Sequence, residues 1–351
     1  MRQIVTFVLL LATSNFLMGQ SKEKDFKAEG KPIVQVFGTA SYDIENGTYD
    51  YSFGRAHLGY EYQFAPDWKA KIIIDRGRAT SVGEITVTDS NNTSLSVENS
   101  STEGAYYTMY LKFASLQWQV NEQLKLEAGA ILQNHYITQE RFWGLRYVAQ
   151  TFQDKYWSIP SSDLGFIAKY QLNDILALDA ALTNGEGPRQ VQDALGKIKL
   201  AAGLDLRPFE TLQTRLYYHH RQSETEAGKN EHLFSAFAGY KPNSTFRIGG
   251  EINYINNLNY AEQVNSYGFS LYSAYHLRAK TEIFARFDRL LYDLSSSNAN
   301  SSLNSGNALF GGLSHSPVKG VHLAINYQGW LPDDDSLSYT NQVLLSMEYK
   351  F

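Results

Sequence analysis

Hydrophobic and polar residues alternate one by one along most of this chain. Between residues 124 and 132 the even-numbered positions are apolar, while Lys125, Glu127 and Gly129 lie between them. The same period of two runs through 197–207, 245–256 and 341–351. Because successive side chains of a strand point to opposite faces, this pattern predicts β-strands with one apolar face. No segment keeps a helical period for longer than a loop insert would need.

The pattern predicts sixteen strands, an even number that is typical of bacterial membrane barrels made from one chain. Most have about the 9–11 residues that a tilted strand needs to cross a bilayer. Strand 105–120 is long enough that we expect a β-bulge in it. The expected strands are 32–43, 49–64, 68–77, 105–120, 124–132, 163–172, 175–184, 197–207, 212–222, 232–241, 245–256, 264–277, 280–293, 308–316, 321–331 and 341–351.

The connections between these strands alternate in length after the first hairpin. Tight turns are expected at 65–67, 121–123, 173–174, 208–211, 242–244, 278–279 and 317–320, and longer loops at 78–104, 133–162, 185–196, 223–231, 257–263, 294–307 and 332–340. Short turns on one side and long loops on the other are typical of an outer-membrane barrel. The expected fold is therefore all-β, a transmembrane antiparallel barrel of sixteen strands.

The first residues resemble a secretory signal. Arg2 precedes the apolar stretch Ile4–Leu11, and Gly19 supplies a small residue for cleavage. That stretch is shorter than the roughly 20 apolar residues that a membrane-spanning helix needs. We therefore expect a signal peptide at 1–19, a periplasmic tail at 20–31 and the barrel at 32–351, which would place the protein in the outer membrane.

Composition narrows the function. The chain has 31 basic and 36 acidic residues, for a net charge of −5, and no cysteine. The absence of cysteine excludes disulfides and thiolate metal sites. The negative net charge argues against nucleic acid as a partner.

Aromatic residues are unusually frequent, with 24 Tyr, 19 Phe and 5 Trp. Those near strand ends suit a bilayer interface, and we expect Trp68, Tyr240, Trp330 and Tyr349 to lie there. Phe351 closes an alternating strand and resembles the signal that the barrel-assembly machinery recognises.

The long connection 133–162 is the third loop on its side of the predicted barrel. It contains seven aromatic residues, whose apolar area favours burial, and the barrel lumen is the surface available. We expect the loop to fold inward and to narrow the pore with its charged residues Glu140, Arg141, Arg146, Asp154 and Lys155. Arg215 and Arg247 are the expected partners on the wall, and together these charges would set the ion selectivity.

Three motifs carry a resemblance to a known family. They are the run from Arg141 to Lys155, RFWGLRYVAQTFQDK, then Ser161-Ser-Asp-Leu-Gly165, then Asn184-Gly-Glu-Gly187. The chain resembles the phosphate-selective porin O/P-like family of Gram-negative outer membranes over most of its mature length. The resemblance implies a sixteen-stranded trimeric porin with its third loop in the lumen. Lipid, lipopolysaccharide, small polar solutes or anions and the assembly machinery would be its partners.

The charges predicted to face inward are of both signs, unlike the arginine ladder and lysine cluster of phosphate-binding members. This mixed lining favours passive diffusion of small polar or ionic solutes, without a cofactor. The expected inward charges are Lys125, Lys169, Lys197, Lys199, Arg207, Arg215, Arg221, Arg247, Arg286, Glu127, Asp179, Asp205, Glu251, Glu282, Asp288 and Glu348.

Several alternatives stay open. A phosphate or anion channel would use the same basic residues, and a plugged structural or adhesive barrel would pass no current. A barrel enzyme acting on lipid would depend on His219, although no nucleophile stands at a fixed spacing from it. His219 and His220 are adjacent on a strand, so they point to opposite faces and are poorly placed to hold one metal. Asp333, Asp334 and Asp335 could hold Ca²⁺, but a solvated acidic loop is the simpler interpretation.

Overall fold

The computed structural model describes residues 26–78, 84–88, 94–98, 107–188, 196–223, 228–294 and 303–351. The expected signal peptide at 1–19 lies outside the described residues, as does most of the expected tail. β1 begins at Glu29, so the last three residues of the expected tail belong to the first strand.

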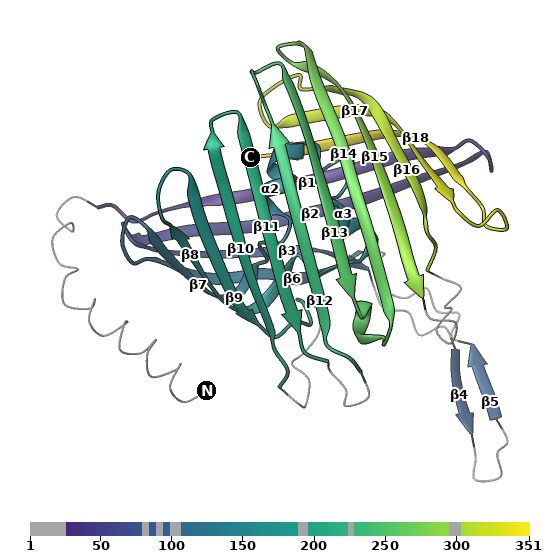
Figure 1. The fold of residues 1–351 in the computed structure, drawn as a ribbon, viewed down its shortest axis with the longest axis horizontal. Coiled ribbons are helices and arrows are strands. Elements are labelled where there is room, and N and C mark those ends of the chain that lie inside the picture. The colour runs from purple at the N-terminus through teal and green to yellow at the C-terminus, as the bar shows by residue number, and fades with distance from the viewer. Residues whose placement is uncertain are drawn as a thin grey trace.

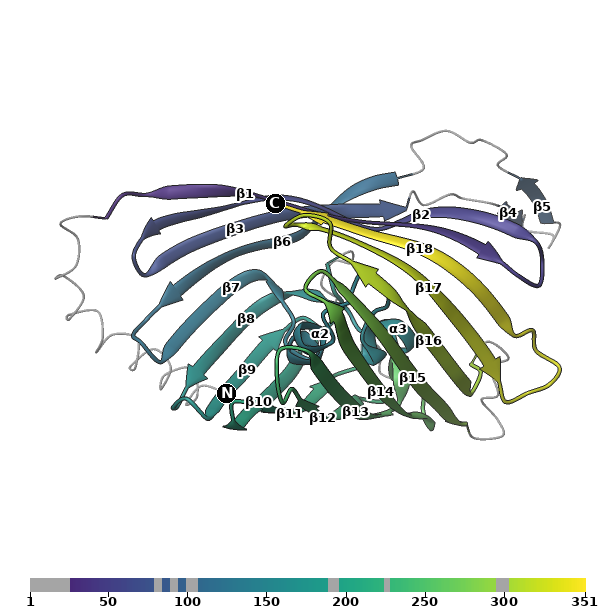
Figure 2. The ribbon, with the colours of Figure 1, turned by 90° about the horizontal axis from the view of Figure 1, so that it is seen from above.

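Sixteen strands form one closed antiparallel barrel (Figures 1 and 2). Each strand pairs with its neighbour along the chain, except that β3 pairs with β6 and β1 pairs with β18. The barrel strands are β1 (Glu29–Asp43), β2 (Thr48–Ala65), β3 (Trp68–Arg78), β6 (Tyr107–Gln119), β7 (Leu124–Leu132), β8 (Ser162–Gln171), β9 (Leu176–Thr183), β10 (Lys199–Phe209), β11 (Leu212–Arg221), β12 (Glu231–Tyr240), β13 (Phe246–Asn256), β14 (Val264–Arg278), β15 (Thr281–Leu294), β16 (Gly306–His315), β17 (Val321–Pro332) and β18 (Thr340–Lys350).

The sequence therefore predicted the number, order and direction of the barrel strands correctly. β4 (Glu84–Thr88) and β5 (Ser94–Glu98) form a separate hairpin within the connection between β3 and β6, which the sequence treated as loop. The short turns and both ends of the barrel sequence lie on one side, which we call the turn side. The longer connections lie on the opposite side, the loop side.

The barrel closes where the last strand meets the first. β1 and β18 pair over nine positions, from Gln35 opposite Lys350 to Asp43 opposite Gln342. Phe351 follows the strand, and its backbone exchanges two hydrogen bonds of 3.1 Å with Val34. The closed ladder leaves no free edge between these two strands, which a barrel in hydrocarbon requires.

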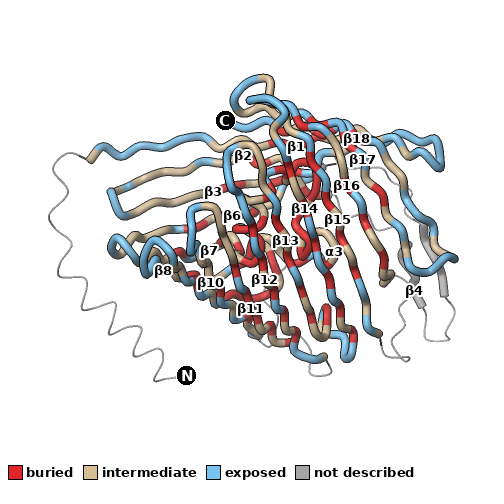
Figure 3. Tube along the Cα trace, turned by 45° about the horizontal axis from the view of Figure 1, so that its top comes forward, coloured by how far each residue is buried: buried red, intermediate tan, exposed pale blue. Residues whose placement is uncertain are grey.

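The period of two in the sequence becomes an inner and an outer face. On β11, Arg215, Tyr217 and His219 are buried inside, whereas Leu216 between them is 51% exposed. Apolar residues such as Ile252 remain exposed on other strands, and burial is concentrated within the ring (Figure 3). The inward charges follow the expectation for Lys199, Arg215, Arg221, Arg286, Glu127, Glu251 and Asp288, which are all buried.

Register shifts interrupt the ladder beside three of the turns and at two positions within the strands. Ile73 pairs with Phe113 and Ile74 with Leu111, so Lys112 is left without a partner position. As a result, Lys112 and Phe113 are both buried although they are adjacent. This confirms the bulge expected in strand 105–120. The other register shift within the strands, between β1 and β2, leaves Gly54 unpaired.

Among the described residues, the helical content is small and is concentrated in one connection. α2 (Ile137–Trp143) and α3 (Phe152–Tyr156) lie between β7 and β8, and a single 3₁₀ turn, η1 (Leu258–Tyr260), lies between β13 and β14. Within the described ranges, no helix combines the length and apolar character needed to cross a bilayer.

Candidate pore constriction

The connection between β7 and β8, residues 133–161, is here called the third loop. Figure 2 shows its two helices inside the ring of strands. α2 ends at Gly144, whose φ of 74° lets its N–H bond to the carbonyl of Glu140. A residue with a side chain would rarely adopt this left-handed conformation, so glycine fixes the point where the chain leaves α2.

Aromatic side chains attach the third loop to the inner wall. Trp143 is 1% exposed, and its ring lies 4.9 Å from that of Tyr272 and 5.9 Å from that of Phe284. The ring of Phe142 lies 5.5 Å from that of Phe237 on β12. These edge-to-face contacts bury apolar area that the lumen would otherwise expose to water, which explains why so aromatic a loop lies inside.

Polar side chains of the wall hold the backbone of the third loop. They satisfy one carbonyl group at the end of α2 and two in the segment between α2 and α3. The bonds are Arg247 Nη2 to the Trp143 carbonyl at 3.0 Å, Gln328 Nε2 to the Val148 carbonyl at 3.0 Å and Arg286 Nη1 to the Gln150 carbonyl at 2.6 Å.

The third loop also contains a cluster of three charged residues, Glu140, Arg146 and Asp154. Arg146 donates through Nε to Glu140 at 2.7 Å and through Nη2 to Asp154 at 2.6 Å. Burial opposes the charge of Arg146, but the two carboxylates outweigh it and raise the pKa of the guanidinium. The three residues together carry a formal charge of −1.

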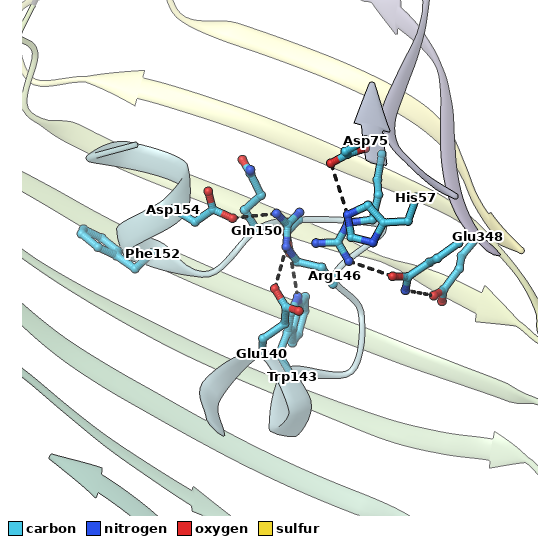
Figure 4. A network of polar contacts seen from close by, with 12 residues as sticks. His57, Asp75, Glu140, Trp143, Arg146, Gln150, Phe152, Asp154 and Glu348 are labelled. Carbon is cyan, nitrogen blue, oxygen red and sulfur yellow. Dashed lines mark hydrogen bonds and ion pairs between the residues drawn. The ribbon is translucent and has the colours of Figure 1, made fainter. Parts of the chain in front are cut away.

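A second charged group stands on strands β2, β3 and β6. Asp75 accepts a hydrogen bond from Lys112 at 2.6 Å, and His57 Nε2 lies 3.2 Å from the same carboxylate. Arg55 donates to Gln35 at 3.0 Å, and Gln35 in turn donates to Glu348 at 2.7 Å. Figure 4 shows Arg146 between Glu140 and Asp154, with His57, Asp75 and Glu348 beyond it.

The two groups influence one another across the space between loop and wall. Tyr136, in the third loop, is affected by charges on both sides. Burial raises the pKa of its hydroxyl most, Glu140 and Asp154 raise it further, and Arg55 lowers it. The third loop therefore presents two acids and one base to a wall that carries Arg55, Lys112 and Asp75. Charges of both signs lie on the third loop and on the wall near it, and Arg146 is close enough to Lys112 for their like charges to repel one another.

Arg215 and Arg247, which the sequence predicted to face the charged residues of the third loop, lie elsewhere on the wall. Arg215 is buried between Asp179, at 2.9 Å, and Asp205, at 2.5 Å. Arg247 pairs with Glu282 at 2.7 Å and holds α2. Arg247 lies on β13, against which α2 packs, and Asp205, the partner of Arg215, accepts a hydrogen bond from Thr138 of α2 at 2.7 Å. Arg215 and Arg247 do not form the wall opposite Arg146, which contains Arg55 and Lys112.

Arg141 and Lys155 point to two other regions of the lumen. Arg141 is exposed and lines a cavity of about 520 Å³ together with Lys125, Lys169 and Arg207. The ammonium of Lys155 lies 5.5 Å from the ring centre of Tyr156. Burial, followed by the charge of Arg286, lowers the pKa of Lys155.

The aromatic residues expected at the membrane interface divide into two groups. Trp68 stacks on Trp118 at 5.3 Å near the turn side, and Tyr240 and Tyr349 are exposed on the outer face. Trp330 does not lie there. It alternates with outward residues of β17, and its ring lies 6.0 Å from that of Tyr156 in α3. The period of two assigns it to the lumen, whereas its closeness to the strand end suggested the interface.

The two adjacent histidines behave as strand geometry requires. His219 is buried inside, with Nε2 3.2 Å from Glu231, while the ring of His220 lies 4.8 Å from that of His232. In the part of the chain that the structure describes, no three His, Asp or Glu residues gather as metal ligands would.

Sequence reasoning missed the wall residues Arg55, His57, Asp75 and Lys112. A signal for two of them was present, since Arg55 and His57 alternate with Ala56 and Leu58. Lys112 could not be assigned a face from alternation, because the bulge changes the parity of β6 at this residue.

The barrel is similar to solved structures of outer-membrane porins. The outer membrane channel DcaP of Acinetobacter baumannii has 15% identity and a TM-score of 0.59 over 94% of this chain and 99% of its own. The anion-selective porin from Comamonas acidovorans has 9% identity and a TM-score of 0.65 over 93% and 100%. OprB of Pseudomonas putida has 11% identity and a TM-score of 0.67 over 92% and 94%. These similarities establish the fold.

No family model matches the chain, and no curated protein sequence matches it. The similarity to known proteins therefore lies in the architecture of the barrel.

Proposed function

We propose that this protein is an outer-membrane porin through which small polar or ionic solutes diffuse passively. The observation that carries the proposal is the sixteen-stranded barrel with exposed apolar residues outside, charged residues inside and a helical loop against one wall. Lipid would cover the outer face. Between the third loop and the wall of Arg55 and Lys112, solutes would pass two sets of fixed charges.

The charge pairs favour a general pore over a strictly anion-selective one. Arg146, Arg215 and Lys112 each have a carboxylate partner within 2.9 Å, so their charges are largely balanced locally. A solute would therefore meet a polar surface with a transverse field and little net charge. Such a surface orients dipolar solutes and discriminates weakly between small anions and cations.

An anion channel, phosphate-selective as the family resemblance implies, is the second candidate. It is favoured by the 520 Å³ cavity on the turn side. Within the described residues, Lys125, Arg141 and Arg207 line this cavity without an ion-pair partner. These cations would attract phosphate, although the carboxylates of Glu122 and Asp174 line the same cavity.

Conductance of the refolded protein in planar lipid bilayers tests both candidates. A steady ohmic current in KCl, with little change when phosphate is added, is the result expected for a general porin. Saturable block by phosphate would assign the 520 Å³ cavity as an anion site and favour the second candidate. The absence of current from folded, inserted protein would overturn the porin proposal.

Further properties follow from this proposal. An exported, trimeric protein would contact lipid and lipopolysaccharide through its outer face. Phe351 is 76% exposed at the end of β18, which would suit recognition by the barrel-assembly machinery. We propose transport without catalysis, because the buried His219 is paired with Glu231 inside the wall.

A further inference from the structure

A second cavity, of about 360 Å³, lies at the loop side of the lumen. Lys155 and Tyr156 of α3 form one side of it, and the loop-side ends of β15 to β18 form the other. Its volume is within the range of small-molecule sites, about 300–1,000 Å³. A solute that enters from the loop side would encounter it near the constriction.

Aromatic rings make up much of this cavity. Trp330 and Tyr292 line it from the wall, and Tyr156 lines it from the third loop. The rings of Tyr156 and Trp330 lie 6.0 Å apart at 37°, so they form two sides of one concave surface. The hydroxyl of Tyr156 already donates a hydrogen bond to Asp288 at 2.8 Å. Tyr156 would therefore contact a ligand through its aromatic ring. Aromatic faces of this kind stack on the apolar C–H face of a sugar ring.

The cavity offers a cation and several hydrogen-bond donors, beside the amide and hydroxyl groups of Asn304, Thr340 and Gln342. Lys155 brings an ammonium that lies 5.2 Å from the ring centre of Phe310, and no carboxylate is among the described residues that line the cavity. Over the described ranges, neither the hydroxyl of Tyr292 nor Nε1 of Trp330 has a hydrogen-bond partner in the protein. Unpaired donors beside one cation favour a ligand that is rich in oxygen acceptors and carries negative charge.

We propose that this cavity binds an acidic saccharide, a pyranose ring that carries a carboxylate. The carboxylate pairs with the ammonium of Lys155, and the ring stacks on Trp330. Tyr292 and the indole N–H donate to hydroxyl oxygens of the sugar. The proposal rests on the proposed function, since the ligand reaches the cavity through the lumen, and it adds a class of solute that the constriction itself does not define.

Tryptophan fluorescence of the detergent-solubilised barrel measures binding without requiring current. Three probes separate the recognised features: glucuronate has both the ring and the charge, glucose has the ring alone, and benzoate has a charge on a flat ring without hydroxyls. We expect glucuronate to change the fluorescence at the lowest concentration. Equal or tighter binding of glucose or benzoate would overturn the assignment to an acidic saccharide.

Variants locate the binding. Lys155→Met keeps the length of the side chain and removes its charge, and we expect glucuronate affinity to fall by about tenfold or more, towards that of glucose. Trp330→Phe should remove most of the fluorescence response. The matched controls are Lys241→Met, in an exposed turn, and Trp68→Phe, on the outer face. Unchanged glucuronate binding in Lys155→Met would overturn the proposal.

Current measurements then separate this proposal from the proposed function. In planar bilayers, glucuronate should reduce the current through the unsubstituted protein at a lower concentration than it reduces the current through the Lys155→Met variant. If the protein conducts and glucuronate neither binds nor blocks, the porin proposal stands and the saccharide site is excluded. If glucuronate binds in detergent and folded, inserted protein passes no current, the site stands and the porin proposal fails.

Discussion

Arg286 and Asp288 lie two residues apart on β15 and form a buried ion pair through two hydrogen bonds, of 2.8 and 2.7 Å. Each of them also holds the third loop. Arg286 donates to the Gln150 carbonyl at 2.6 Å, and Asp288 accepts from the Tyr156 hydroxyl at 2.8 Å. Because residues i and i+2 of a strand share a face, one short segment of wall fixes both ends of α3.

We expect Arg286→Met to loosen the third loop. The substitution leaves Asp288 buried without its counter-charge, which costs about 3–5 kcal/mol in comparable buried pairs. Limited proteolysis of the folded barrel should then cut between residues 144 and 151, and the open-channel current should fluctuate more. Arg289→Met is the matched control, because Arg289 lies on the same strand as Arg286 but forms an exposed pair with Asp333 of the connection after β17. If Arg286→Met resists proteolysis as well as the control does, Arg286 does not hold the third loop in place.

The transverse field predicts opposite effects from its two sides. Glu140→Gln with Asp154→Asn leaves Arg146 unbalanced, so selectivity should shift towards anions. Arg55→Gln with Lys112→Gln should shift it towards cations. The measurement is the reversal potential in a tenfold KCl gradient, which is about 59 mV for a pore that passes only one of the two ions. We expect each double variant to shift the reversal potential by about 10 mV. Shifts of the same sign in both double variants would show that the two groups do not face a common passage.

Gly268 provides a steric test of how the third loop docks. A Cβ atom at this inward position of β14 would lie 1.8 Å from Cζ of Phe152, which is itself fully buried. Gly268→Ala should therefore displace α3, at a cost of about 1–3 kcal/mol, and increase proteolysis of the third loop. Adding Phe152→Leu should restore part of the protection. Gly311→Ala is the control, because its Cβ would meet its nearest neighbour at 3.8 Å.

His135 predicts a pH dependence of stability. Both ring nitrogens are buried without a hydrogen-bond partner among the described residues, and burial holds its pKa well below 6.5, with Lys199, His219 and Arg215 acting in the same direction. Below pH 6.5 the unfolded chain therefore binds a proton that the folded chain does not, and stability is lost as the pH falls.

The measurement is urea unfolding in detergent at pH 7 and pH 5. Each pH unit below 6.5 should cost up to about 1.4 kcal/mol from this one group, and His135→Phe should reduce the slope accordingly. His315→Phe, at an exposed position, serves as the control. An unchanged slope in His135→Phe would mean that the imidazole is protonated in the folded barrel.

The barrel itself was predictable because its signal is repeated along the chain. The expected strand 124–132 coincides with β7, and the alternation assigned Arg215 and Glu127 to the inner face. A closed sheet with one apolar face constrains every strand in the same way, so an uncertain strand is supported by its neighbours.

The candidate site was less predictable because it depends on contacts between distant segments. The sequence identified Glu140, Arg146 and Asp154 as charged residues of the third loop, but their mutual pairing depends on how the backbone turns after Gly144. The facing wall was missed because it includes Lys112, whose inward position depends on a bulge. Local alternation carries no information about such a shift in parity.

The contact between Val34 and Phe351 imposes an order in time on the formation of the barrel. The partners that close the ring come from opposite ends of its sequence, so β1 cannot complete its pairing until β18 has been synthesised. Until then, the unpaired backbone of β1 presents an edge to which any passing strand could add. A cell that makes this protein must keep that edge covered from the emergence of the first strand until the arrival of the last.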